Sequence, residues 1–186
     1  MPPARRPSAT HAQLEFDFTA RSAGDAVRRP LELRVGTPRR RNVEAVLEAD
    51  RIVVTYPPRM NRAEAERIAE ELRTKLERRT AAETIDLAER AATLARRHGL
   101  ATPRSIAWSH RQQALWGVCT GDGDIRISTR LAELPRFVLD AVIVHELAHL
   151  CHLDHGPEFA ALVGRYPKTE RAMGYLMALD HHARPS

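Results

Sequence analysis

The sequence predicts an α+β domain in which a small antiparallel sheet packs against one long apolar helix and several flanking helices. Short apolar segments near residues 31–55 and 105–128, several of them alternating with polar residues, are typical of strands. Longer segments at residues 61–98 and 136–155 contain neither Gly nor Pro, which is typical of helices. With 186 residues, the chain is long enough for one main domain with a buried core.

The first 60 residues are predicted to form two parts. Residues 1–30 are rich in Pro, Ala, Arg and Ser, which predicts a disordered arm. Residues 31–60 are predicted to form a β segment. Within it, residues 31–35 alternate between apolar and polar side chains, and residues 43–47 and 52–55 are expected to pair as a hairpin.

Two amphipathic helices are expected next, at the start of a domain that runs from residue 61 to residue 186. Asn61 is a favourable N-cap, and the helix that follows is predicted to reach about residue 79. A second helix is predicted from about residue 82 to His98, where Gly99 ends it. The charged faces of both helices predict a scaffold role.

A second group of strands is predicted between residues 105 and 128. Residues 105–108 and 115–119 are apolar enough for strands. A tight turn at residues 121–123 then leads into a strand over residues 125–128.

One long buried helix is predicted from about Pro135 to His149. The apolar run that begins at Phe137 continues into the sequence His-Glu-Leu-Ala-His of residues 145–149 without a turn signal. On a helix, His145 and His149 lie on one face, one turn apart, and therefore can bind the same metal ion. Glu146 is adjacent to the first histidine. The alternative is a hydrogen-bonded pair of buried histidines with Glu146 at the surface.

His155 is the expected third metal ligand. The Cα atom of His152 would lie about 10 Å along the helix axis from that of His145, too far for one ion to bind both. Gly156 permits a positive φ and Pro157 stops the helix, so the chain is expected to reverse and bring His155 back. His152 and Glu158 remain alternative ligands. Helices are predicted from Pro157 to Val163 and from residue 168 to residue 179.

At this point the chain resembles the YgjP-like metal-dependent hydrolases, which are related to the SprT-like and WLM zinc peptidases. The resemblance rests on four segments: residues 116–119 (Trp-Gly-Val-Cys), 125–131, 144–150 and 152–159. It implies a small zincin-like peptidase domain, with Zn²⁺ bound by His145, His149 and His155 and with Glu146 as the general base. In such folds an edge strand beside the metal binds the substrate backbone. The chain departs from the usual family pattern at Leu115, Val118 and Ala160.

These features predict a zinc-dependent hydrolase whose substrate is a peptide or protein. Hydrolysis of other amides is an alternative within the same chemistry. A different alternative is a non-catalytic zinc protein that binds nucleic acid or a partner through its basic arm. The group that stabilises the oxyanion is not identified; the candidates are His110, Arg130, His152, Tyr166 and Tyr175.

Charge and cysteine content limit the possible partners and the expected compartment. Residues 1–41 hold nine Arg against four acidic residues, so the net charge of +5 comes from this end of the chain. Weak contact with nucleic acid or another polyanion is therefore an expected property of the arm. Two cysteines do not form a secreted disulfide framework, and no apolar leader or membrane span is evident. A cytoplasmic location is expected.

Overall fold

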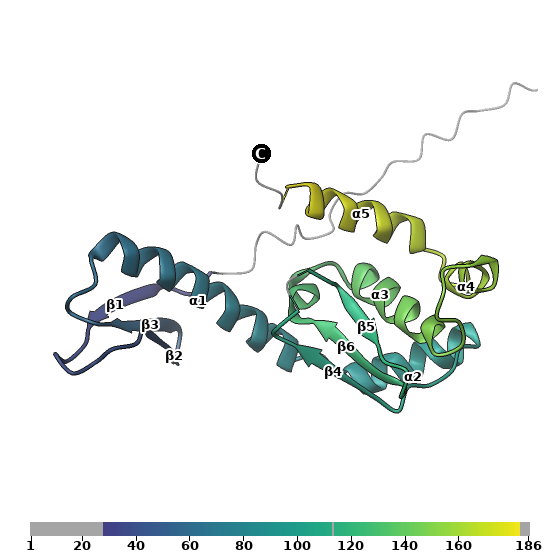
Figure 1. The fold of residues 1–186 in the computed structure, drawn as a ribbon, viewed down its shortest axis with the longest axis horizontal. Helices are drawn as coiled ribbons and strands as arrows, with labels where there is room; N and C mark the ends of the chain where they lie inside the picture. The colour runs from purple at the N-terminus through teal and green to yellow at the C-terminus, as the bar shows by residue number, and fades with distance from the viewer. Residues whose placement is uncertain (1–27, 113, 183–186) are drawn as a thin grey trace, which may run out of the picture.

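The chain folds into two small three-stranded sheets and five α-helices (Figure 1), which confirms the α+β class. The computed structural model describes residues 28–112 and 114–182, so residues 1–27 of the predicted arm lie outside it. The elements are β1 (Leu31–Val35), β2 (Glu44–Glu48), β3 (Arg51–Tyr56), α1 (Arg62–Glu83), α2 (Leu87–His98), β4 (Ser105–Ser109), β5 (Gly117–Cys119), β6 (Asp124–Ser128), the 3-10 helix η1 (Thr129–Glu133), α3 (Arg136–His149), α4 (Pro157–Val163) and α5 (Thr169–His182). None of the described helices combines the length and the apolar character needed to cross a lipid bilayer.

The two sheets are mixed, and the expectation of an antiparallel sheet was wrong in this respect. The strand orders are β1-β3-β2 and β4-β6-β5, so the third strand of each group lies in the centre. It pairs in parallel with the first strand and antiparallel with the second. The central strands carry the most deeply buried side chains, among them Ile52, Val54, Ile125 and Ile127. In each sheet the strand with the most buried side chains therefore takes the central position, where a strand on either side covers it.

Helix α1 connects the first sheet to the rest of the protein (Figure 1). It contacts β1, β2 and β3, and it also contacts η1, which follows the second sheet. The helix begins after Asn61, whose side chain accepts a hydrogen bond from the backbone N–H of Glu64, as predicted. It ends at Glu83, four residues later than predicted.

The boundary between α1 and α2 differs from the prediction because Asp86 caps the second helix. Asp86 accepts a hydrogen bond from the N–H of Glu89 at 2.9 Å and starts α2 at Leu87 rather than near residue 82. At the other end, Gly99 adopts a φ of 61° and ends the helix, as predicted.

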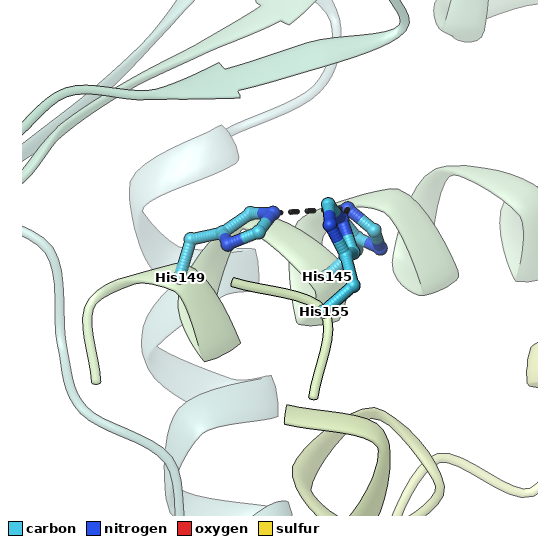
Figure 2. A group of neighbouring side chains, drawn as sticks. All are labelled: His145, His149 and His155. Atoms are coloured by element: carbon cyan, nitrogen blue, oxygen red, sulfur yellow. Dashed lines mark hydrogen bonds between the residues drawn. The ribbon is translucent and has the colours of Figure 1, made fainter. Parts of the chain in front are cut away.

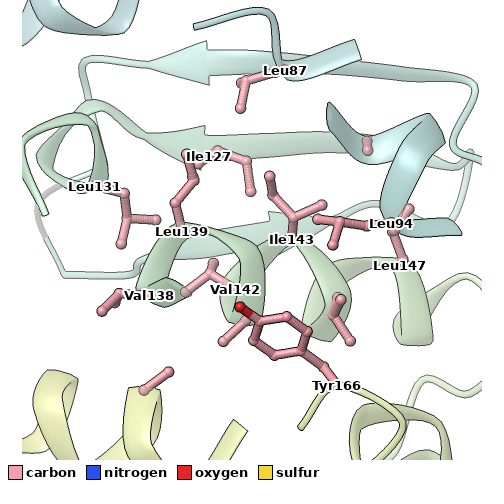
Figure 3. Close-up of a cluster of buried hydrophobic side chains, with 14 of the residues drawn as sticks. Leu87, Leu94, Ile127, Leu131, Val138, Leu139, Val142, Ile143, Leu147 and Tyr166 are labelled. Atoms are coloured by element: carbon pink, nitrogen blue, oxygen red, sulfur yellow. The ribbon is translucent and has the colours of Figure 1, made fainter. Parts of the chain in front are cut away.

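Helix α3 forms the centre of the main core (Figure 3). Nine of its 14 residues are buried, and eight of these nine are apolar. A helix that is apolar on nearly all sides is typical of the interior of a protein. It contacts α2, α4, α5, β5, β6 and η1. On one side, Asp140 pairs with Arg90 of α2 and lies 3.4 Å from the hydroxyl of Tyr166.

Replacement of Ile127 by Ala should destabilise the protein by about 2–5 kcal/mol, because this fully buried side chain joins β6 to the core around α3. Chemical denaturation with two spectroscopic probes measures the change. Val46→Ala serves as the control, since Val46 is 48% exposed and should shift the free energy of unfolding by less than about 0.5 kcal/mol. Equal effects of the two substitutions would contradict this description of the core.

Candidate metal centre and active site

Three imidazole rings, from two segments of the chain, meet at the C-terminal end of α3 (Figure 2). His145 and His149 lie one turn apart on α3, and His155 comes from the loop between α3 and α4. Their possible ligand atoms all lie within 4.8 Å of one another. In the described part of the chain, this is the one group of three or more His, Cys, Asp or Glu side chains with the spacing of a metal site.

The distances from His145 to the other two rings fit a single tetrahedral ion. The Nε2 atom of His145 lies 3.2 Å from Nε2 of His149 and 3.4 Å from Nε2 of His155. Nitrogen donors bound to zinc at the usual bond length and tetrahedral angle lie about 3.3 Å apart. The two separations from His145 match this value, and a set of three imidazole donors leaves a fourth position for water or substrate.

The chain reverses after α3 and returns His155 to the cluster, although by a different route from the one expected. Gly156 has φ −69° and ψ −176°, so the reversal does not use the positive φ that glycine permits. Pro157 begins α4 immediately afterwards. The carbonyl oxygen of His152 lies 3.0 Å from Nδ1 of His149. This contact suits the tautomer that keeps Nε2 of His149 unprotonated and available as a donor to a metal ion.

Phe159 of α4 supports all three rings, a role that sequence reasoning did not assign. The centroid of its ring lies 4.9 Å from that of His145, 4.5 Å from that of His149 and 4.7 Å from that of His155. The side chain is 5% exposed and packs with Ala148 and Val163. Its position in the first turn of the helix after His155 is the sequence signal that points to this contact.

Burial gives His145 and Glu146 unusual acid–base properties. Desolvation, followed by the charges of His149 and His155, lowers the pKa of His145 to about 4, so that its ring is neutral and able to bind a cation at neutral pH. Desolvation raises the pKa of Glu146 to about 7. A carboxyl group with this pKa can accept and release a proton near neutral pH.

Glu146 is buried with 5% exposure, which contradicts the alternative that placed it at the surface. Strand β5 passes directly over its carboxylate. A Cβ atom at Gly117 would lie 2.5 Å from Oε1 of Glu146, closer than any normal contact. The glycine of the Trp-Gly segment therefore provides the space that the carboxylate occupies.

The alternative metal ligands and the candidates for the oxyanion-binding group make other contacts. Nδ1 of His152 lies 3.3 Å from Oε2 of Glu158, so these two side chains interact with each other outside the three-imidazole group.

The guanidinium of Arg130 lies over the ring of Trp116, and the ring of Tyr175 packs against Phe137. The oxyanion candidates also include Tyr166, which contacts Asp140, and His110, which lines a cleft beside α1. None of these contacts identifies the oxyanion-binding group.

Both cysteines are free thiols. Burial, followed by the charge of Glu146, raises the pKa of Cys119, which therefore stays protonated. Cys151 is exposed.

Comparison with known proteins supports the resemblance seen in the sequence. The family model described as YgjP-like, metallopeptidase domain matches residues 59–177. This range begins just before α1 and includes all three clustered histidines and Glu146. Searches of curated proteins and of solved structures gave no match.

Replacement of Gly117 by Ala should displace the carboxylate of Glu146 and reduce the hydrolysis of a fluorogenic peptide library on the order of 100-fold. The clash involves the side chain of Glu146 from Cγ outward and no backbone atom, so the melting temperature should change less than the turnover does. Gly121→Ala is the matched control, because nothing lies within 4 Å of the position of its added Cβ. Full activity in Gly117→Ala would show that the carboxylate position is not important.

Proposed function

Because this chain belongs to the YgjP-like metallopeptidase family, we propose that it is a zinc peptidase that hydrolyses peptide bonds with Glu146 as general base. The observation that carries the proposal is the buried carboxylate of Glu146 immediately beside the three-imidazole cluster. A purely structural zinc site has no need of a buried carboxylate at this position. Burial of a carboxylate costs free energy, which function explains better than stability does.

Zinc is the proposed metal on the chemistry of the donors. Three neutral imidazoles with an open fourth position are typical of catalytic zinc sites, whereas calcium and magnesium prefer oxygen donors. We assign His145, His149 and His155 as the ligands. Phe159 and the carbonyl of His152 would hold the rings in the orientation that the ion requires.

The three histidines and Glu146 would have different roles in the reaction. A zinc ion bound by the three histidines supplies Lewis-acid chemistry, which polarises a carbonyl group and acidifies water. Glu146 takes a proton from the attacking water and later transfers it to the leaving amine. Its carboxylate is held between α3 and β5, which excludes bulk water from one side.

Strand β5 is the proposed binding edge for the substrate backbone. It lies at one edge of its sheet, pairs only with β6 among the described strands, and passes over Glu146 at Gly117. An extended peptide can add to such an edge by main-chain hydrogen bonds. This arrangement would bring the substrate backbone next to the general base.

The purified protein should contain about one zinc ion per chain, measured by inductively coupled plasma mass spectrometry. Zinc should be lost or held much more weakly in His149→Ala and in His155→Ala, because each removes one of the three donors that the described residues bring together. His152→Ala should retain zinc, since its ring interacts with Glu158 instead. Absence of zinc from the parent protein after reconstitution would refute the proposal.

Glu146→Gln should keep the zinc and lower peptide turnover by about 10²- to 10⁴-fold, because the amide cannot accept the proton. Glu158→Gln changes the same chemical group at an exposed position outside the cluster and should leave turnover nearly unchanged. The rates are compared on one peptide library at equal zinc occupancy. A Glu146→Gln variant with parental turnover would show that another group is the base.

We also propose that the basic N-terminal arm contacts nucleic acid or another polyanion. A cytoplasmic location is a separate proposal. The surplus of arginine in residues 1–41 favours contact with nucleic acid. Three of these arginines, Arg28, Arg34 and Arg40, form ion pairs with glutamates of the fold. Fewer of the arginines in residues 1–41 are therefore available to bind a polyanion than the sequence count indicates. A deletion of residues 1–27 leaves β1 intact and allows salt-dependent DNA binding to be compared with the full chain.

A further inference from the structure

An apolar pocket of about 270 Å³ lies beside the proposed general base, between α3, α5 and the segment that leads into β5. His145 and Glu146 form part of its wall on the α3 side. Ala141 and Val142 of α3 and Leu176 of α5 are among the apolar residues that line it. The pocket and the three-imidazole cluster therefore share His145.

Exposed apolar side chains gather at this pocket. Leu115, Met173 and Met177 are 56%, 49% and 68% exposed, and all three line it. The other large apolar side chains with comparable exposure among the described residues are Val35, Val46, Leu47 and Leu153, none of which lines it. A group of exposed apolar side chains around a concave site is typical of a binding surface. Methionine is well suited to this role because its flexible side chain adapts to different ligands.

The walls of the pocket are connected by polar contacts on one side. The indole Nε1 of Trp116 donates a hydrogen bond to Oδ2 of Asp180 at 3.1 Å. The guanidinium of Arg130 lies 3.7 Å from the centre of the Trp116 ring and 3.8 Å from Oδ1 of Asp180. These contacts join the segment before β5 to the last turns of α5. Contacts within the chain therefore connect two walls of the pocket.

We propose that this pocket binds one large apolar side chain of the peptide substrate, that of Leu, Met or Phe, at a residue flanking the cleaved bond. The inference rests on the proposed peptidase function, because the position relative to the cleaved bond follows from His145 and Glu146 in the wall. A peptide paired with the edge of β5 directs alternate side chains to one face, and this pocket lies beside that strand.

Size and polarity both favour a single apolar side chain. Pockets that enclose a whole small-molecule ligand measure about 300–1,000 Å³, so a pocket of this volume suits a smaller group. A charged side chain would lose hydration among mainly apolar neighbours. Burial of a Leu or Phe side chain should favour such substrates over alanine on the order of 10- to 100-fold in kcat/KM.

The methionines themselves provide a test that needs no turnover. The chain has four methionines: Met60 lies away from this pocket, Met1 is outside the described residues, and Met173 and Met177 line the pocket. Full-length, zinc-loaded Glu146→Gln protein with ¹³C-methyl methionine is titrated with alanine peptides that carry one Phe, or one Asp in its place. The Phe peptide should shift the methyl signals of Met173 and Met177 but not that of Met60. Equal shifts with both peptides, or no shifts with either, would overturn the proposal.

Cleavage mapping in the active enzyme tests the same inference by a second route. Mass spectrometry of a digested peptide library should show Leu, Met or Phe enriched at one position beside the cleaved bond. Met177→Glu should lower that preference at least tenfold, because it adds a charge to the rim. Ala178→Glu adds the same charge to the next residue of α5, which is exposed and does not line the pocket, and should keep the preference.

The two readouts separate failure of this inference from failure of the proposed function. Cleavage without apolar enrichment would overturn the pocket proposal and leave the peptidase function supported. Methyl shifts without any cleavage by the zinc-loaded parent would contradict the peptidase function and leave the apolar ligand class of the pocket supported.

Discussion

The burial of α3 is the constraint on which the rest of the site depends. Its apolar side chains are packed by helices and strands on nearly every side, so the helix has little freedom to rotate or shift. Two histidines and a glutamate lie on this rigid helix, so the core rather than a loop fixes their backbone positions. Only His155 comes from a loop, and Phe159 packs against it from the start of α4.

The same burial determines the chemistry of the site. Desolvation disfavours charge on both His145 and Glu146, and it therefore lowers the pKa of one and raises that of the other. A neutral imidazole is the form that binds a metal ion, and a carboxyl group that titrates near neutrality is suited to proton transfer. Removal from water thus favours metal binding by His145 and proton transfer by Glu146.

The sequence predicted the elements well because strong local signals specify them. Asn61, Gly99 and the apolar run of α3 each define a boundary or a buried helix by short-range chemistry. The hairpin of β2 and β3 was predicted, but the parallel pairing of β1 with β3 and of β4 with β6 was not, since another strand separates the two partners in the sequence. The approach of His155 to His145 followed from the sequence, but the route at Gly156 did not. Phe159 and the apolar pocket depend on contacts between several elements, which no single segment reveals.

The central claim, that three histidines bind one zinc ion in a site with an open position, is tested most directly by X-ray absorption spectroscopy at the zinc edge of the reconstituted protein. The account predicts three nitrogen donors and one oxygen donor at about 2.0–2.1 Å, with no sulfur. A sulfur donor at about 2.3 Å would contradict it, because that would place a cysteine in the coordination sphere. So would a shell made only of oxygen donors, because that would place the metal outside the three-imidazole cluster.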